Sequence, residues 1–243
     1  MAKKEANYKK KAKQNNTKAC VMKVMAYVIA TLLLGVAIVI GIILYQNRQG
    51  MEEPEISIED TDLHLGSGVN VISIGSYFGG YVEDGSDELV KDTMMIIIEN
   101  TGDKQIQVMQ VTVNGTYVFD LTTLLPGEKM MVLEKNRAKY KEGMEITSVT
   151  VSNVAFFKGA PSMQEDKLQI VEEDGFIIIT NIGGTTIAGG RVFYKNTVDD
   201  VLLGGITYSV TFPRLEPGQT VKMSSKHYTT ERSKLIFVNY EEQ

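Results

Sequence analysis

Apolar residues are distributed in two different ways along the chain. One run, from Val24 to Tyr45, contains 22 residues without a charged side chain. After residue 54 the apolar residues occur in short runs rich in Val, Ile, Thr, Tyr and Phe, separated by Gly, Asn, Asp and Pro. A long uncharged run predicts a membrane-spanning helix, whereas short punctuated runs predict β-strands. We therefore expect one transmembrane α-helix followed by an all-β region.

The run from Val24 to Tyr45 is long enough to cross a hydrocarbon core of roughly 30 Å as a helix. A cleaved signal peptide would have a shorter apolar core and a small-residue cleavage site, and no such site follows here. Residues 1–23 carry eight Lys and one acidic residue, a sum of +7, whereas Arg48 is the single basic residue close behind the run. By the positive-inside rule, we expect a single-pass protein of the cell membrane with a basic cytoplasmic tail and extracellular C-terminal domains.

Charge and composition narrow the classes of function. Residues 46–243 contain 17 basic and 29 acidic residues, a sum of −12, which argues against a nucleic-acid-binding body. The chain has one Cys, so a disulfide scaffold is excluded. It has two His and no Trp, which is poor material for side-chain catalysis. Composition therefore favours a binding or structural protein over an enzyme.

The β region contains an internal repeat, which is the strongest sign of its domain organisation. An apolar run ending in Asn-x-Gly occurs at Asn100 and again at Asn181, 81 residues later. A Leu-x-Pro-Gly turn occurs at Leu124 and again at Leu215, 91 residues later. The difference of ten residues predicts a longer central loop in the second unit, at 196–205.

Each unit has about 90–100 residues and turn signals every 8–12 residues, which is typical of an Ig-like sandwich of two sheets. Residues 135–142 are the one short helical candidate in this region. We expect two tandem Ig-like β-sandwiches behind the transmembrane helix. The expected segments are a tail at 1–23, a helix at 24–45, a linker at 46–54, a first sandwich at 55–158 and a second at 159–243.

Framework residues in both units resemble those of bacterial extracellular Ig-like domains of the CARDB and FxLYD type. Such domains carry a strand ending in Asn-x-Gly, a central V-x-V or V-x-Y strand and a Leu-x-Pro-Gly-Glu turn. The resemblance implies adhesive, spacing or assembly modules without catalytic chemistry. It rests on Asn100, Gly102, Val111, Val113, Leu124, Pro126, Gly127 and Glu128, and on Asn181, Gly183, Val192, Tyr194, Leu215, Pro217, Gly218 and Gln219.

One aromatic cluster is a candidate binding surface. Tyr77, Phe78 and Tyr81 surround a Gly-Gly pair, which indicates a loop or a bulged strand with exposed rings. Exposed rings of this kind would bind a glycan or a peptide. The alternative interpretation is a strand that turns a corner and buries alternate rings.

The acidic run that follows is a weak candidate for calcium. Asp84, Asp87 and Glu88 supply oxygen ligands, but the spacing lacks the full pattern of a calcium loop. A solvated acidic turn is therefore the favoured interpretation. No Cys/His cluster has zinc spacing, and no Ser or Cys nucleophile stands in a recognisable catalytic motif. We expect no catalytic residue, no bound metal and no cofactor.

These observations lead to one functional hypothesis with two alternatives. The hypothesis is a non-catalytic, membrane-anchored surface protein that acts in protein–protein interaction or assembly at a bacterial cell envelope. Its partners would be the membrane, through Val24 to Tyr45, and another envelope protein. The first alternative is a glycan- or peptide-binding module that uses Tyr77, Phe78 and Tyr81. The second is an accessory subunit of a secretion or pilus-like machine.

Overall fold

The structure, a computed structural model, describes residues 54–66 and 68–242 of the chain. These residues form an all-β fold in several sheets, which confirms the all-β prediction for this region. Within these residues no helix is long and apolar enough to span a membrane. The predicted cytoplasmic tail and transmembrane helix, and the predicted linker up to residue 53, lie outside the described residues.

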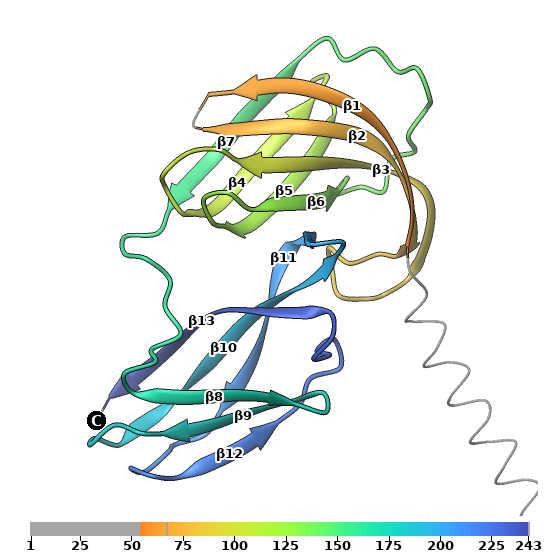
Figure 1. The fold of residues 1–243 in the computed structure, drawn as a ribbon. Helices are drawn as coiled ribbons and strands as arrows, with labels where there is room; N and C mark the ends of the chain where they lie inside the picture. The colour runs from red at the N-terminus through yellow and green to blue at the C-terminus, as the bar shows by residue number, and fades with distance from the viewer. Residues whose placement is uncertain (1–53, 67, 243) are drawn as a thin grey trace, which may run out of the picture. The chain divides into compact units, whose positions relative to one another are not determined.

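The strands follow one another along the chain and divide naturally at the segment after residue 156 (Figure 1). We call β1–β7 the first lobe and β8–β13 the second lobe. The bounds are β1 (Glu55–Leu65), β2 (Val69–Gly80), β3 (Leu89–Asn100), β4 (Ile106–Val113), β5 (Tyr117–Leu124), β6 (Lys129–Leu133), β7 (Val149–Phe156), β8 (Leu168–Glu173), β9 (Phe176–Asn181), β10 (Ile187–Val198), β11 (Val201–Phe212), β12 (Thr220–Met223) and β13 (Ser233–Glu242).

The first lobe has a core between two sheets. Antiparallel pairing joins β1, β2, β3 and β6 on one side, and β5, β4 and β7 on the other. Successive side chains of a strand point to opposite faces, so alternate residues of β3 enter this core. Ile96 and Ile98 of β3 are fully buried there with Val111 of β4 and Phe119 of β5.

The second lobe repeats this plan with a separate core. Its sheets contain β12, β9 and β8 on one side, and β11, β10 and β13 on the other. Ile177 and Ile179 of β9 pack against Val192 and Tyr194 of β10, and all four are fully buried. In chain order β9 corresponds to β3 and β10 to β4, as the sequence repeat predicts.

The repeated Asn has the same hydrogen bonds in both lobes. Asn100 donates from Nδ2 to the carbonyl oxygens of Lys104 and Leu124, at 2.9 and 3.0 Å. Its Oδ1 accepts the backbone N–H of Gly102 at 3.1 Å. Both Asn side chains are buried, so these bonds replace water for their polar atoms. The equivalent bonds of Asn181 go to Thr185, Leu215 and Gly183, at 2.9, 3.0 and 3.0 Å.

The two Pro-Gly turns also match. Gly127 and Gly218 have φ of 78° and 79°, the left-handed region that the third position of a type II turn requires. A backbone hydrogen bond from the fourth residue to the first closes each turn, at 3.1 and 2.9 Å. Each turn leads directly into the next strand, β6 or β12. The prediction that each Pro-Gly pair forms a type II turn before a strand is therefore confirmed.

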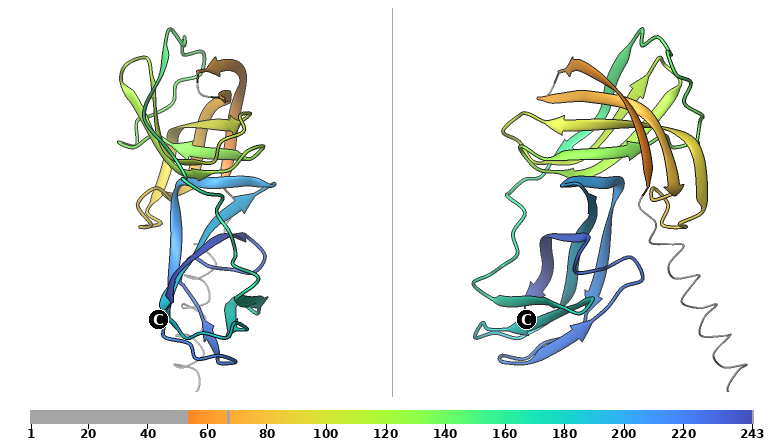
Figure 2. Two further views of the ribbon diagram at one scale, coloured as in Figure 1. Left: turned by 90° about the vertical axis from the view of Figure 1, so that its left-hand side faces the viewer. Right: turned by 45° about the vertical axis from the view of Figure 1, so that its right-hand side comes forward.

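The prediction of a longer central loop at 196–205 was wrong. Most of these residues extend the β10–β11 hairpin, which is visible from two further sides in Figure 2. Near its tip, Leu202 and Leu203 pair in parallel with Met130 and Met131 of β6. The insertion therefore joins strands of both lobes into one seven-stranded sheet, in the order β1-β2-β3-β6-β11-β10-β13.

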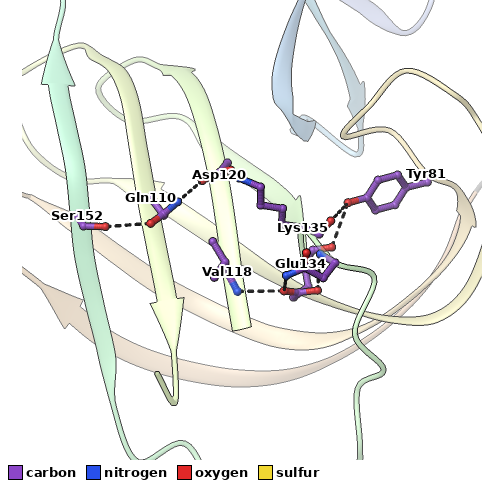
Figure 3. Close-up of polar contacts among 8 residues, drawn as sticks. Tyr81, Gln110, Val118, Asp120, Glu134, Lys135 and Ser152 are labelled. Carbon is purple, nitrogen blue, oxygen red and sulfur yellow. Dashed lines mark hydrogen bonds and ion pairs between the residues drawn. The ribbon is translucent and has the colours of Figure 1, made fainter. Parts of the chain in front are cut away.

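The helical candidate at 135–142 was also wrong, because these residues form turns. The buried carboxylate of Glu134 accepts the backbone N–H groups of Asn136 and Ala138, both at 2.8 Å. It also accepts the N–H of Val118 at 3.1 Å (Figure 3). Bonds from the backbone of residues two and four positions onward to one side chain offer this segment an alternative to helical hydrogen bonds.

Candidate functional site

The loop between β2 and β3, residues 81–88, contains most of the residues predicted to be functional. Arg137 donates from one nitrogen to Asp84 at 2.9 Å and from the other to Glu88 at 2.6 Å. The same guanidinium lies over the ring of Tyr81, 4.3 Å from its centroid. Hydrogen bonds from Ser86 and then Arg137 hold the pKa of Asp84 below its ordinary value. One Arg thus fixes both carboxylates within the first lobe.

Asp87 connects the same loop to the second lobe. Its carboxylate accepts Lys226 Nζ at 2.8 Å and lies 3.5 Å from Nδ1 of His227. The ring of His227 stacks on Tyr208 with centroids 4.8 Å apart. The three carboxylates proposed for calcium are therefore each paired with a cation of the protein. In the part of the chain that the structure describes, no group of acidic, His or Cys residues is arranged to hold a metal ion.

Of the two interpretations of the aromatic cluster, the structure supports the strand that buries rings for two of its three members. Tyr77 and Tyr81 are 2% and 3% exposed. Tyr77 donates to the carbonyl of Gly80 at 2.8 Å, and Tyr81 donates to the carbonyls of Glu134 and Lys135 at 3.1 and 2.9 Å (Figure 3). Burial raises the pKa of both phenols, that of Tyr81 to about 12.

These rings belong to an apolar cluster on the outer face of the first lobe's larger sheet. Met95 of β3 and Met131 of β6 pack there with Tyr77 and Tyr81, and Leu203 from the β10–β11 hairpin packs against them. The hairpin tip thus covers a sheet face that would otherwise be exposed to solvent. This accounts for the nearly unbroken apolar sequence of β3, which has a core on each side.

Glu83 lies at the centre of the contact between the lobes. Its carboxylate accepts the backbone N–H of Leu133 in β6 and of Gly205 in β11, both at 2.7 Å. Burial raises the pKa of this carboxyl to about 7, against the opposing effects of these N–H groups and of Lys195. A single side chain therefore ties a strand of the first lobe to a strand of the second.

Lys195 of β10 is the basic counterpart of Glu83. Its side chain is fully buried, and Nζ donates to the carbonyls of Gly204, Gly205 and Ile206 at 3.2, 3.2 and 2.6 Å. Burial lowers its pKa to about 7, and the nearby charges of Glu83 and then Glu128 oppose this shift. Three acceptors satisfy the three N–H groups of the ammonium, so the buried cation is fully hydrogen-bonded. We call Glu83, Lys195 and residues 204–206 the interlobe joint.

The joint requires glycine at two positions. Gly204 has φ of 83°, and a Cβ there would fall 2.8 Å from a methyl group of Val82. A Cβ on Gly205 would fall 1.9 Å from the carbonyl oxygen of Asp120 in β5. The hydroxyl of Thr122, also in β5, donates to the carbonyl of Gly205 at 2.7 Å. The backbone of β11 therefore approaches β5 more closely than any side chain would allow.

The edge of the seven-stranded sheet presents a different surface. Residues 55–60 of β1 are exposed, and Ile56 and Ile58 keep 38% and 49% of their surface in contact with solvent. A groove of about 400 Å³ lies over β1 and the neighbouring strands β2 and β3. Phe78 is the one member of the aromatic cluster that lines this groove. The other lining residues are Glu55, Ile56, Ser57, Ser76, Lys91 and Asp92.

Comparison with known proteins adds no further constraint. No family model, no curated protein and no solved structure matches the chain. The candidate sites therefore follow from geometry alone, and they are the interlobe joint and the exposed half of β1. At the interlobe joint Lys195 is buried and both charged side chains bond to backbone groups, whereas the exposed half of β1 is accessible along its length.

Sequence reasoning singled out the acidic loop but not its charged partners. Lys195 stands in the run Val-Phe-Tyr-Lys-Asn, where an alternating strand pattern gives no reason to expect a buried cation. Arg137 was assigned to a helical candidate, and its contacts lie about 50 residues back along the chain. The edge strand had one available signal, since Ile56 and Ile58 alternate with polar residues before any turn.

The joint predicts a pH dependence of stability. The ordinary pKa of a Glu carboxyl is 4.5, and that of Glu83 in the folded chain is about 7. At pH values between these two, Glu83 is deprotonated in the unfolded chain but still protonated in the folded chain. The folded state then binds more protons, so the free energy of unfolding falls as pH rises. From pH 5 to pH 7 we expect the wild type to lose about 1–3 kcal/mol relative to Glu83→Gln, measured by urea unfolding. A difference between the two proteins that stays constant over this range contradicts the prediction.

Proposed function

We propose that this protein is a non-catalytic, membrane-anchored surface protein that acts in protein–protein interaction or assembly at the cell envelope. The uncharged run from Val24 to Tyr45, with Lys-rich residues before it, supports an N-terminal anchor whose tail is cytoplasmic. The two lobes, each with a core between two sheets and the same Asn and Pro-Gly features, support a tandem pair of Ig-like sandwiches.

The observation that carries the interaction proposal is the edge strand β1. Among the described strands β1 pairs with β2 alone, so its other edge offers unpaired backbone N–H and C=O groups. Natural proteins usually protect such edges, and an extended, accessible edge is a template for a strand from another protein. Ile56 and Ile58 add exposed apolar surface at the same place. A partner that adds a strand here would cover both the backbone and these side chains.

The glycan-binding alternative has less support from the geometry. It needs Tyr77 and Tyr81 on the surface, and both rings are buried with their hydroxyls bonded to backbone carbonyls. The accessory-subunit alternative is a particular case of the proposal, in which the partner of β1 belongs to a larger machine. The identity of the partner distinguishes it from a free-standing surface protein.

Site-specific cross-linking in living cells tests the proposal. We expect a photo-reactive amino acid at position 58 of the full chain to form a discrete adduct with one other protein. The same amino acid at position 182 serves as a matched control, because Ile182 is 53% exposed against 49% for Ile58 and lies in the turn after β9. Adducts are detected as a mass shift on denaturing gels and identified by mass spectrometry.

The adducts at position 58 are interpreted by comparison with those at position 182. An adduct at position 58 and none at position 182 supports docking at β1. No adduct at position 58, or equal adducts at both positions, contradicts it.

A further inference from the structure

The exposed half of β1 has two chemically different faces. Its register sets Ile56 opposite Tyr77 and Ile58 opposite Gly75, so both Ile side chains lie on the sheet face that carries the outer apolar cluster. Alternation places Glu55 and Glu59 on the other face. Both of these Glu residues are exposed. A strand added beside β1 would therefore meet apolar side chains on one face and carboxylates on the other.

The strand at this edge carries charge of one sign. Residues 54–62 contain four acidic residues and no Lys or Arg, while Lys91 of β3, two strands in from the edge, lines the groove. Cross-strand pairs of opposite charge stabilise a sheet, whereas like charges directly opposite each other destabilise it. The side chains of an added strand that face Glu55 and Glu59 are therefore best matched by Lys or Arg.

The same charge argues against a second copy of this chain as the occupant. An antiparallel pairing of two β1 strands centred on Ser57 would set Glu55 of each copy opposite Glu59 of the other. The edge would then gain apolar contacts between Ile side chains but bring carboxylates together on the opposite face. Charge complementarity therefore selects a different, basic segment.

We propose that the β1 edge binds an extended segment of another protein in which Lys or Arg residues alternate with aliphatic residues. The segment adds to the sheet through backbone hydrogen bonds with β1. Its aliphatic side chains pack on Ile56 and Ile58, and its basic side chains pair with Glu55 and Glu59. This inference rests on the proposed function, since it names the chemistry of the partner that docks at β1.

Synthetic peptides test the chemistry directly with the purified full-length chain in mild detergent. The probe is an eight-residue peptide of alternating valine and lysine, and the comparison is the same peptide with glutamate in place of lysine. A third peptide keeps the valine–lysine sequence but is N-methylated at every second backbone nitrogen on the edge that would face β1. We expect the valine–lysine peptide to bind and to slow hydrogen exchange in residues 55–60. N-methylation should weaken binding at least about tenfold, because main-chain hydrogen bonds supply the affinity of strand addition.

Variants of the chain separate strand addition from general attraction to an acidic protein. We expect the double variant Ile56→Ser/Ile58→Ser to lose about fivefold or more in affinity, because the apolar face no longer packs on the peptide. Val171→Ser is the matched control, because Val171 is 45% exposed on β8, another edge strand. Its affinity should equal that of the wild type.

Several results would overturn the inference. Equal binding of the valine–glutamate peptide removes the charge argument, and an N-methylated peptide that binds fully removes strand addition. Equal losses of peptide affinity in the β1 double variant and in Val171→Ser would show that the peptide is attracted to the protein as a whole and not bound at β1. If position 58 forms its adduct in cells but the valine–lysine peptide does not bind, docking at β1 stands and the partner chemistry is wrong. If the peptide binds β1 but no adduct forms, the proposed function fails instead.

Discussion

Replacing Lys195 with methionine should lower the free energy of unfolding by about 3–5 kcal/mol, because three buried carbonyl groups lose the ammonium that bonds to them. Methionine fills a similar volume but donates no hydrogen bond. The carbonyls of residues 204–206 would each lose a donor in a site from which water is excluded. Glu83 would also lose the nearby positive charge that partly offsets its burial.

Urea unfolding of the full chain measures this effect, and Lys234→Met is the matched control. Lys234 also reaches across to the first lobe, where Nζ lies 2.7 Å from Oε1 of Glu128. Its side chain is 54% exposed, although that of Glu128 is 13% exposed, so solvent screens the ammonium and we expect a loss of about 1 kcal/mol. The same substitution at the two lysines therefore compares a buried cation with a solvated one. Similar losses at both positions would contradict the importance of the joint.

A double variant separates the charge pair from packing. In Glu83→Gln/Lys195→Met neither titratable group remains, so the effect of removing Lys195 on the ionisation of Glu83 is absent. We expect the loss in the double variant to be smaller than the sum of the two single losses, because the two groups interact. Strict additivity would mean that Glu83 and Lys195 contribute independently.

Replacing either repeated Asn with Asp should lower the free energy of unfolding by about 2–4 kcal/mol, because two buried carbonyl acceptors lose their donors. The carboxylate keeps the size of the amide but presents oxygen to both carbonyls. Asn100 and Asn181 make the same bonds in the two lobes, so we expect similar losses at both positions.

Asn114→Asp is the control for this prediction. Its side chain also bonds to the backbone, donating to the carbonyl of Glu145 at 2.9 Å and accepting the N–H of Thr147 at 2.8 Å. These bonds are exposed, so water replaces a lost partner and the expected change is below about 1 kcal/mol. Thermal or urea unfolding of the three variants measures their free energies of unfolding. A loss at Asn100 or Asn181 no larger than at Asn114 would show that the repeated motif does not anchor the lobes.

The repeated framework was predictable from the sequence because its signals are local. A Pro followed by Gly before an apolar run specifies a turn through backbone φ preferences, and Gly127 and Gly218 have the φ that this requires. An apolar run ending in Asn-x-Gly likewise marks the end of a strand, and β3 and β9 end at Asn100 and Asn181. The recurrence of both motifs in the same order, 81 and 91 residues later, predicted that the two units share a plan.

The errors arose where a distant segment decides the conformation. The hydrophobic residues at 201–203 were assigned to a loop because no local feature shows that β6 is available to pair with them. For Tyr77 and Tyr81 the sequence leaves two interpretations open, because their glycine neighbours suggest a loop with exposed rings while the alternation also fits a strand that buries them. Their burial depends on the β10–β11 hairpin and on the backbone after β6, both of which are far away in sequence.

By itself the sequence determined the all-β architecture of the described region, the repeat, the turns and the acidic character of the loop before β3. Tertiary structure alone decided that Glu83 bonds to strands of both lobes and that Lys195 is buried. Glu83 and Lys195 lie 112 residues apart, and each looks like an ordinary surface charge among its neighbours in the chain. Turn and strand preferences are properties of a few adjacent residues. The environment of a charge depends on which distant segments exclude water from it, and only the folded chain settles that.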